Sequence, residues 1–146
     1  MAGSRRSPPP PSDPEQGIWQ GRSVARRFVS PDGLTVLVGR SAADNDLLTF
    51  ELGSPRDAWL HVAAESGSHV VVRNPDGLER LPRDTLRFAA ALAARHSKAK
   101  NASRVAVHVA TFAEVSKQRG SPPGEVTLRR YSTLYASPAA DQASAG

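Results

Sequence analysis

Residues 39–72 constrain the fold most, because polar and titratable side chains alternate there with short apolar runs. The segment reads GRSAADNDLLTFELGSPRDAWLHVAAESGSHVVV. Polar groups placed beside buried strands are costly unless they find partners. The segment therefore predicts either a binding site or a polar network that fixes the fold, and its chemically active members are Asn45, Asp46, Asp57, Trp59, His61, Ser68 and His69.

Short apolar runs separated by turn residues predict one small α+β domain with a mixed, mostly antiparallel sheet. The turn Pro31-Asp32-Gly33 joins the first two runs into a hairpin. In the third run, strict alternation places Trp59 and His61 on the face opposite the aliphatic side chains. A chain of 146 residues is long enough for one such core. The expected strands are residues 28–29, 34–38, 58–62, 69–73, 104–110, 125–128 and 131–135.

Two helices are expected beside this sheet. A short helix over residues 41–50 has Ser41 and Asp44 at the spacing of a capping box. The main helix begins at Pro82, where a missing N–H costs little. At about 100° per residue, its apolar side chains share one wide arc. The opposite arc carries Arg83, Arg87, Arg95 and Lys98.

The basic arc of the main helix is the best physical argument for a partner. A solvated helix face normally mixes both signs of charge, because like charges at helical spacing repel. Here only Asp84 offsets the cations, which favours contact with phosphates. The alternative is that Arg95 and Lys98 complement the helix C-terminus, but it leaves Arg83 and Arg87 unexplained.

The charge of the whole chain also favours an anionic partner, with nucleic acid as the first candidate. The formal net charge is +5, and arginine supplies most of the positive charge. A second basic segment, SKQRGSPPG at residues 116–124, predicts a defined loop with Lys117 and Arg119 at its base. Loops of this composition also occur in proteins that bind nothing, so this segment is weak evidence alone.

Other classes of protein are disfavoured by what the sequence contains. It has no cysteine, which excludes disulfides, thiolate zinc sites and cysteine nucleophiles. No apolar run reaches the length of a membrane span, and the first residues lack the apolar core of a secretory signal. We therefore expect a cytoplasmic protein that makes no membrane contact. We expect residues 1–18 to be a disordered Pro/Ser-rich tail, residues 19–136 the domain, and residues 137–146 a flexible tail.

Asp57, His61 and His69 permit a competing interpretation, a small metal-dependent or hydrolytic enzyme. A metal held by the two histidines would lack a third ligand other than Asp57. Ser68 adjoins His69 on a strand, so the two side chains point to opposite faces and do not form a catalytic pair. No catalytic residue, metal or cofactor is therefore expected, and an ordering role suits the three residues better. Trp59 is either a stacking surface for a base or a core residue.

Residues 28–138 resemble the NFACT RNA-binding domain, because several short motifs occur in its order and spacing. Each motif is weak alone, and the match becomes specific because they extend over most of the expected domain. The matching pieces are SPDG at residues 30–33, VGR at 38–40, NDLLT at 45–49, DAWLH at 57–61, GSHVV at 67–71, AAALAA at 89–94, SKA at 97–99, PGEV at 123–126 and YSTL at 131–134.

The resemblance implies a non-catalytic RNA-binding module. In larger NFACT proteins this module lies at the C-terminal end of ribosome quality-control factors that bind tRNA and the large ribosomal subunit. The chain looks like the module alone, so a separate NFACT-type protein is a candidate partner. It departs from the family pattern at Ser116-Lys117, where paired lysines are frequent. The residues expected to bind tRNA or ribosomal RNA are Arg40, Asn45, Asp57, Trp59, His61, Ser68, His69, Arg83, Arg87, Arg95, Lys98, Lys117 and Arg119.

Overall fold

Six antiparallel strands form the central sheet of the computed structural model, which describes residues 7–138. Across the sheet their order is β10-β7-β5-β6-β4-β3. Their bounds are β3 Ala25–Val29, β4 Thr35–Gly39, β5 Ala58–Val62, β6 Val70–Val72, β7 Val105–Thr111 and β10 Ser132–Ala136. The expected α+β fold is confirmed, and every strand pair in this sheet is antiparallel.

Two small strand pairs extend this frame. β1 (Ile18–Trp19) pairs with β2 (Arg22–Ser23), and β8 (Val115–Ser116) pairs with β9 (Thr127–Leu128). The strand expected at residues 125–128 is therefore shorter in the structure, and β1, β2 and β8 are additional. Strands of two residues carry too little alternation to be found from the sequence.

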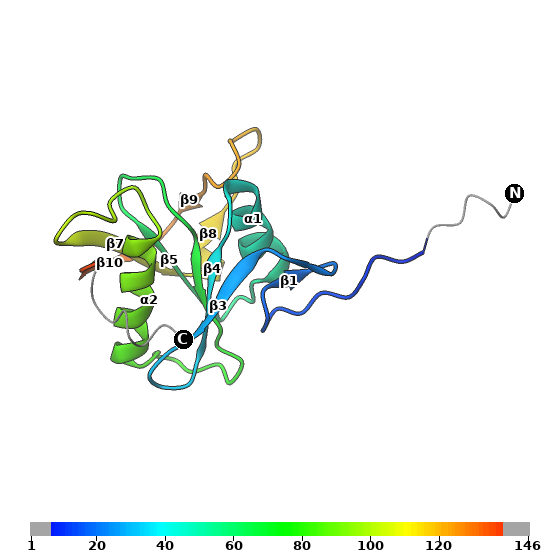
Figure 1. Cartoon of the computed structure of the whole chain (residues 1–146), viewed down its shortest axis with the longest axis horizontal. Coiled ribbons are helices and arrows are strands. Elements are labelled where there is room, and N and C mark those ends of the chain that lie inside the picture. The colour runs from blue at the N-terminus through cyan, green and yellow to red at the C-terminus, as the bar shows by residue number, and fades with distance from the viewer. Residues whose placement is uncertain (1–6, 139–146) are drawn as a thin grey trace, which may run out of the picture.

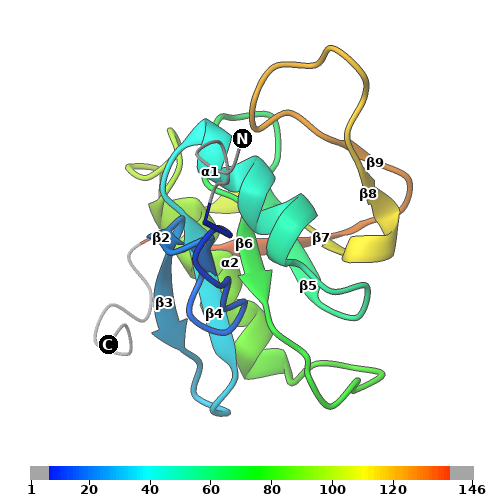
Figure 2. The ribbon, with the colours of Figure 1, turned by 90° about the vertical axis from the view of Figure 1, so that its right-hand side faces the viewer.

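Helices cover the two faces of the sheet. α2 (Arg83–Arg95) lies on one face, and α1 (Ala42–Leu47) with the π-helical turn η2 (Leu48–Leu52) lies on the other. Figures 1 and 2 show the sheet between these two layers. Within residues 7–138, no helix is apolar over a length sufficient to cross a membrane.

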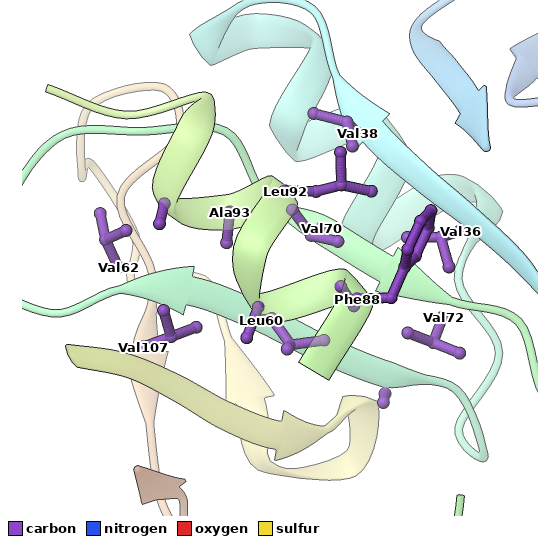
Figure 3. Close-up of a cluster of buried hydrophobic side chains, with 14 of the residues drawn as sticks. Val36, Val38, Leu60, Val62, Val70, Val72, Phe88, Leu92, Ala93 and Val107 are labelled. Atoms are coloured by element: carbon purple, nitrogen blue, oxygen red, sulfur yellow. The ribbon is translucent and has the colours of Figure 1, made fainter. Parts of the chain in front are cut away.

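Alternation along β5 divides the core as the sequence predicts. Leu60 points toward α2, where valines of four strands pack against Phe88 and Leu92 (Figure 3). Trp59 points the other way and packs with Leu48 of η2. Each face of the sheet therefore has its own apolar cluster, and the side chains of Trp59 and its neighbours belong to the α1 side.

The short helix begins as predicted, because the Ser41 hydroxyl accepts a hydrogen bond from Asp44 N at 3.1 Å. The helical segment continues through η2 to Leu52, two residues beyond the predicted end. A side chain at Gly39 would clash with Asn45, so the close approach of β4 to α1 requires glycine there. This approach places Asn45 next to the start of β6.

The main helix begins at Arg83 and ends at Arg95, so Lys98 lies beyond it in a turn. The Ser97 hydroxyl donates to Ala94 O and accepts from Ala99 N, which turns the chain away from the helical path. A second finding concerns the arc expected to be basic. Ala91 and Ala94 lie on that arc and are 5% and 0% exposed, so they separate the basic side chains into two groups.

The packed part of the chain begins before the boundary expected near residue 18. Glu15 accepts hydrogen bonds from Thr35 at 2.8 Å and from Arg73 at 3.3 Å. The two residues that bind the Glu15 carboxylate lie in distant segments of the chain. The composition of a Pro/Ser-rich stretch does not reveal such contacts. The flexible tail expected at residues 137–146 lies almost wholly outside the described residues, as do residues 1–6.

Candidate nucleic-acid interface

An open pocket of about 540 Å³ lies on the α1 side of the sheet. We call it the aromatic pocket. Its floor is formed by Trp59 and His61 of β5, by His69 just before β6 and by His108 of β7. Its walls are formed by α1, by residues 64–67 and by residues 123–128. Side chains from these segments line it, among them Asn45, Trp59, His61, His69, Lys98 and His108. Five of the residues expected to form the site thus meet here: Asn45, Trp59, His61, His69 and Lys98.

His69 is buried and holds the pocket together. Its Nε2 lies 2.8 Å from Gly124 O, and its Nδ1 lies 2.7 Å from the Thr49 hydroxyl. A carbonyl only accepts, so Nε2 carries the proton and Nδ1 accepts from Thr49. Burial lowers the pKa of His69 to about 4, against the favourable effect of the Gly124 carbonyl on the charged form. The ring is therefore neutral at physiological pH and has an ordering role.

The loop that walls the pocket is fixed to α1 by Asp46. This carboxylate accepts from Gly124 N at 3.1 Å and pairs with Lys117 at 3.2 Å. Lys117 also donates to the carbonyls of Pro122 and Glu125. Lys117 is expected from the sequence to bind RNA, but in the structure its ammonium group is occupied in closing its own loop.

Trp59 is a core residue. The sequence alone permits either this role or that of a stacking surface for a base. Its side chain is 2% exposed, and it stacks on His61 with ring centroids 5.8 Å apart and 18° between planes. His61 covers it and is half-buried at the pocket floor. The ring face accessible to a ligand is therefore the open side of His61, and Trp59 packs against the other side of that ring. Trp59 Nε1 is the one buried side-chain polar atom within residues 7–138 that lacks a hydrogen-bond partner.

Two further aromatic side chains extend this surface. His108 is directly opposite His61 in the antiparallel β5–β7 register, so the two project from the same face. Tyr131 contacts His108 with a centroid distance of 4.2 Å and is 54% exposed. His61, His108 and Tyr131 therefore form an aromatic row. His108 and Tyr131 are absent from the residues expected to bind, because only the strand register reveals that they are neighbours of His61.

Desolvation lowers the pKa of His61 below its ordinary value, although hydrogen bonds to the backbone of Val62 and Gly67 oppose the shift. Nearby His108 acts in the same direction as desolvation. A neutral imidazole offers a π-face and no positive charge. The floor of the aromatic pocket is thus suited to stacking, and phosphate recognition must come from its margin.

That margin carries three exposed cations, Arg95, Lys98 and Lys100, which we call the basic rim. They line a second, more open hollow that shares Ala42, Asn45, Ser66, Gly67 and Lys98 with the aromatic pocket. Within the part of the chain that the structure describes, none of the three forms an ion pair with a carboxylate. The two hollows therefore make one continuous surface with unneutralised cations beside aromatic rings.

Backbone contacts fix the geometry of this surface. Ser68 N donates to His96 O, and Lys98 N donates to Ser66 O, both at 2.9 Å. Gly67 lies so close to Ser97 that an added Cβ would be 2.7 Å from the serine Cβ. The turn after α2 and the loop before β6 are thereby joined, which holds the basic rim beside the pocket.

Asp57, Asn45 and Ser68, which are also expected to bind RNA, have side-chain hydrogen bonds that stabilise the fold. Asp57 is 1% exposed and accepts from Ser54 N, Asn74 N and Arg73. The side-chain oxygen Oδ1 of Asn45 accepts from His69 N at 3.1 Å, and the Ser68 hydroxyl donates to Gly39 O at 2.8 Å. These three side chains therefore belong to a polar network that fixes the fold, which is one of the two roles predicted for residues 39–72.

The remaining expected residues lie apart from the aromatic pocket. Arg83 and Arg87 line a hollow at the opposite end of α2, and Arg119 lines a small one within its own loop. Arg40 is exposed, and its guanidinium donates to the Ser23 hydroxyl. The structure thus separates Arg83 and Arg87 from Arg95 and Lys98, whereas the sequence predicts these four residues on one helical face.

The geometry gives no support to a catalytic or metal site at Asp57, His61 and His69. The carboxylate of Asp57 is occupied by Arg73, and both ring nitrogens of His69 are hydrogen-bonded. Within residues 7–138, no group of three histidine or acidic side chains is placed to hold a metal ion.

The chain matches the family model described as the NFACT protein RNA binding domain over residues 25–130. It belongs to the NFACT RNA-binding domain family. The matched residues include both the aromatic pocket and the basic rim. The expected family membership is therefore confirmed.

Proteins similar to this NFACT RNA-binding domain are much longer. A Bacillus subtilis protein named Rqc2 homolog RqcH is 38% identical over 118 residues, which are 81% of this chain and 20% of that protein. The Drosophila melanogaster Ribosome quality control complex subunit NEMF homolog is 33% identical over 99 residues, 67% of this chain and 10% of that protein. The chain thus spans a fifth or less of these two relatives.

A solved structure has the same fold as this NFACT RNA-binding domain. It is the C-terminal part of the fibronectin/fibrinogen-binding protein from Streptococcus suis, with a TM-score of 0.76 and 33% sequence identity. The match covers 82% of this chain and 47% of that one. The α+β architecture is therefore shared with an experimentally determined relative.

Proposed function

We propose that the chain binds RNA without catalysis, through the aromatic pocket and the basic rim. The bound RNA is tRNA or ribosomal RNA of the large subunit, and the setting is ribosome-associated quality control in the cytoplasm. Support comes from the family, which is described as RNA-binding, and from relatives that carry ribosome quality control in their names. A separate NFACT-type protein remains the candidate protein partner.

One observation carries the proposal: unpaired cations and half-buried aromatic rings share one continuous surface. Arg95, Lys98 and Lys100 are exposed beside a pocket floored by His61 and His108. Lysine and arginine supply phosphate contacts, and aromatic rings stack on bases of any sequence. The combination is typical of proteins that bind unpaired nucleotides.

The ring face at the floor of the pocket favours an unpaired base over a duplex. A base within a helix presents only its edges, whereas the open side of His61 offers a ring face backed by Trp59. A base stacked there would extend the Trp59–His61 pair by one layer. Its phosphates would then lie toward Lys98, which lines both hollows.

The decisive measurement is the salt dependence of RNA binding. Purified protein is titrated with labelled tRNA and with large ribosomal subunits over a series of salt concentrations. The variant combines Arg95→Ala, Lys98→Ala and Lys100→Ala. For three lost phosphate contacts we expect the slope of log K against log salt to fall in magnitude by about 2 to 3.

The matched control is Arg129→Ala, because Arg129 is an exposed arginine that Glu114 already pairs at 2.8 Å. This change should leave the slope nearly as it is in the unmodified protein. If the triple variant kept the original affinity and slope, the basic rim would not contact RNA and the proposal would fail.

Stacking is tested separately with Tyr131→Ala, since the ring is exposed and its loss does not disturb the core. Loss of one base–aromatic contact should weaken binding by about tenfold. Phe50→Ala is the control, because Phe50 is an exposed aromatic on η2 that lies outside the aromatic row. Equal effects of the two variants would contradict the aromatic row.

A further inference from the structure

A separate hollow lies at the N-terminal end of α2, and we call it the arginine groove. Its volume is about 580 Å³. It is lined by residues from the loop after β6, from the first turns of α2 and from the adjoining strands β7 and β10. Figure 1 shows the chain entering α2 from that loop and leaving at the other end toward β7. About 12 Å along the axis of α2 therefore separates Arg87 of the groove from Arg95 of the basic rim.

Four arginines line the groove: Arg56, Arg80, Arg83 and Arg87. All four are exposed, and none has a carboxylate partner among residues 7–138. Glu79 is the one acidic residue in the lining. This concentration of uncompensated guanidinium groups favours a ligand that carries several negative charges.

The floor of the groove is aliphatic. Leu78 is 43% exposed, and further aliphatic side chains line the groove with it, so the apolar surface here is contiguous. No aromatic residue is present in the lining, in contrast to the aromatic pocket. The floor therefore offers no ring on which a base could stack, but it can bury branched aliphatic side chains. Its members are Leu78, Leu81, Leu86, Val109 and Leu134.

We propose that the arginine groove binds an acidic peptide segment of a partner protein, whose aliphatic side chains enter the floor while its carboxylates pair with the arginines. Charge complementarity argues for this occupant over a second copy of the chain, since two copies each carry a net charge of +5. The sequence of residues 139–146, AADQASAG, has no aliphatic side chain larger than alanine, so it lacks the anchors the floor requires.

The test starts with a random-peptide display library selected against the full chain. We expect enrichment of peptides that combine Asp or Glu with Leu, Ile or Val. The affinity of a selected peptide is then measured by fluorescence anisotropy for the unmodified protein and for an Arg83→Glu, Arg87→Glu double variant. An Arg40→Glu, Arg119→Glu double variant is the matched control, because both arginines are exposed, lie outside the groove and give the same change in net charge.

The expected result is at least about tenfold weaker peptide binding by the double variant, with little change in the control. Methyl resonances of Leu78, Val109 and Leu134 should shift on peptide addition. The proposal is overturned if no acidic-aliphatic sequences are enriched, or if their binding survives the double charge reversal.

The same variants also test two other occupants of the groove, RNA and a second copy of the chain. If tRNA binding weakened with the double variant and tRNA displaced the peptide, the groove would be part of the RNA surface. If the chain sedimented as a dimer that the double variant dissociated, the groove would be a self-interface. Either result refutes a peptide site, whereas the RNA-binding proposal depends only on the basic rim variants.

Discussion

Protonation of His69 should destabilise the domain, and the size of the effect follows from its surroundings. The buried ring donates through Nε2 to Gly124 O and accepts at Nδ1 from Thr49, so a second proton has no acceptor at Nδ1. The pKa of His69 is lowered from 6.5 to about 4 in the folded protein. In the unfolded chain the ring regains its ordinary pKa and is the stronger base.

The unfolded state therefore binds more protons than the folded state between these two pKa values, and stability falls as pH is lowered through this range. The stabilisation is fully present above about pH 6.5 and is lost progressively toward about pH 4. For this shift, the free energy of unfolding should be about 2 kcal/mol lower at about pH 5 than at about pH 7. Such a loss is a large part of the stability of a typical domain.

Urea unfolding at several pH values measures this directly, with His69→Gln as the comparison. Glutamine can donate and accept, but it does not titrate. Burial also lowers the pKa values of His61 and His96, and both remain in the variant, so the difference between the two profiles isolates His69. Parallel profiles for the two proteins, or a His69 pKa near its ordinary value by NMR, would refute the reasoning.

Three further changes have defined consequences for stability. Asp57→Ala leaves the guanidinium of Arg73 without its buried partner and two backbone N–H groups unpaired, and should lower the free energy of unfolding by about 3 to 5 kcal/mol in urea titrations, whereas Asp57→Asn should cost less. Ser41→Ala removes the N-cap of α1 and should cost about 1 kcal/mol, seen as a lower thermal midpoint. Gly67→Ala places a Cβ 2.7 Å from that of Ser97 and should cost about 1 to 3 kcal/mol while also weakening RNA binding, because the loop moves away from the basic rim. Unchanged thermal midpoints for these variants would contradict the contacts on which each depends.

The sequence predicts the local features of this fold well, because they depend on neighbouring residues. Alternation in residues 58–62 correctly separates Leu60 from Trp59, and the spacing of Ser41 and Asp44 correctly locates a helix start. The main helix starts within one residue of its predicted position. These features depend on the period of apolar residues and on the spacing of capping residues, and both can be recognised without knowing which segments pack together.

The features that the sequence does not reveal depend on contacts between distant segments. The pairing of His61 with His108 follows from the β5–β7 register, which no local pattern specifies. The two basic groups on α2 are separated because Ala91 and Ala94 are buried, and alanine fits exposed and buried helix positions equally well. The sequence predicts that Lys117 is a free cation, whereas the structure shows that Asp46 pairs with it.

The hydrogen bonds that close the aromatic pocket also determine when the pocket can form during synthesis. Gly124 is bound by His69 across 55 positions and by Asp46 across 78. A nascent chain that has not yet released residue 124 would therefore have the floor without its far wall, and a buried imidazole N–H without an acceptor. The complete aromatic pocket can therefore form only after the chain has emerged as far as Gly124.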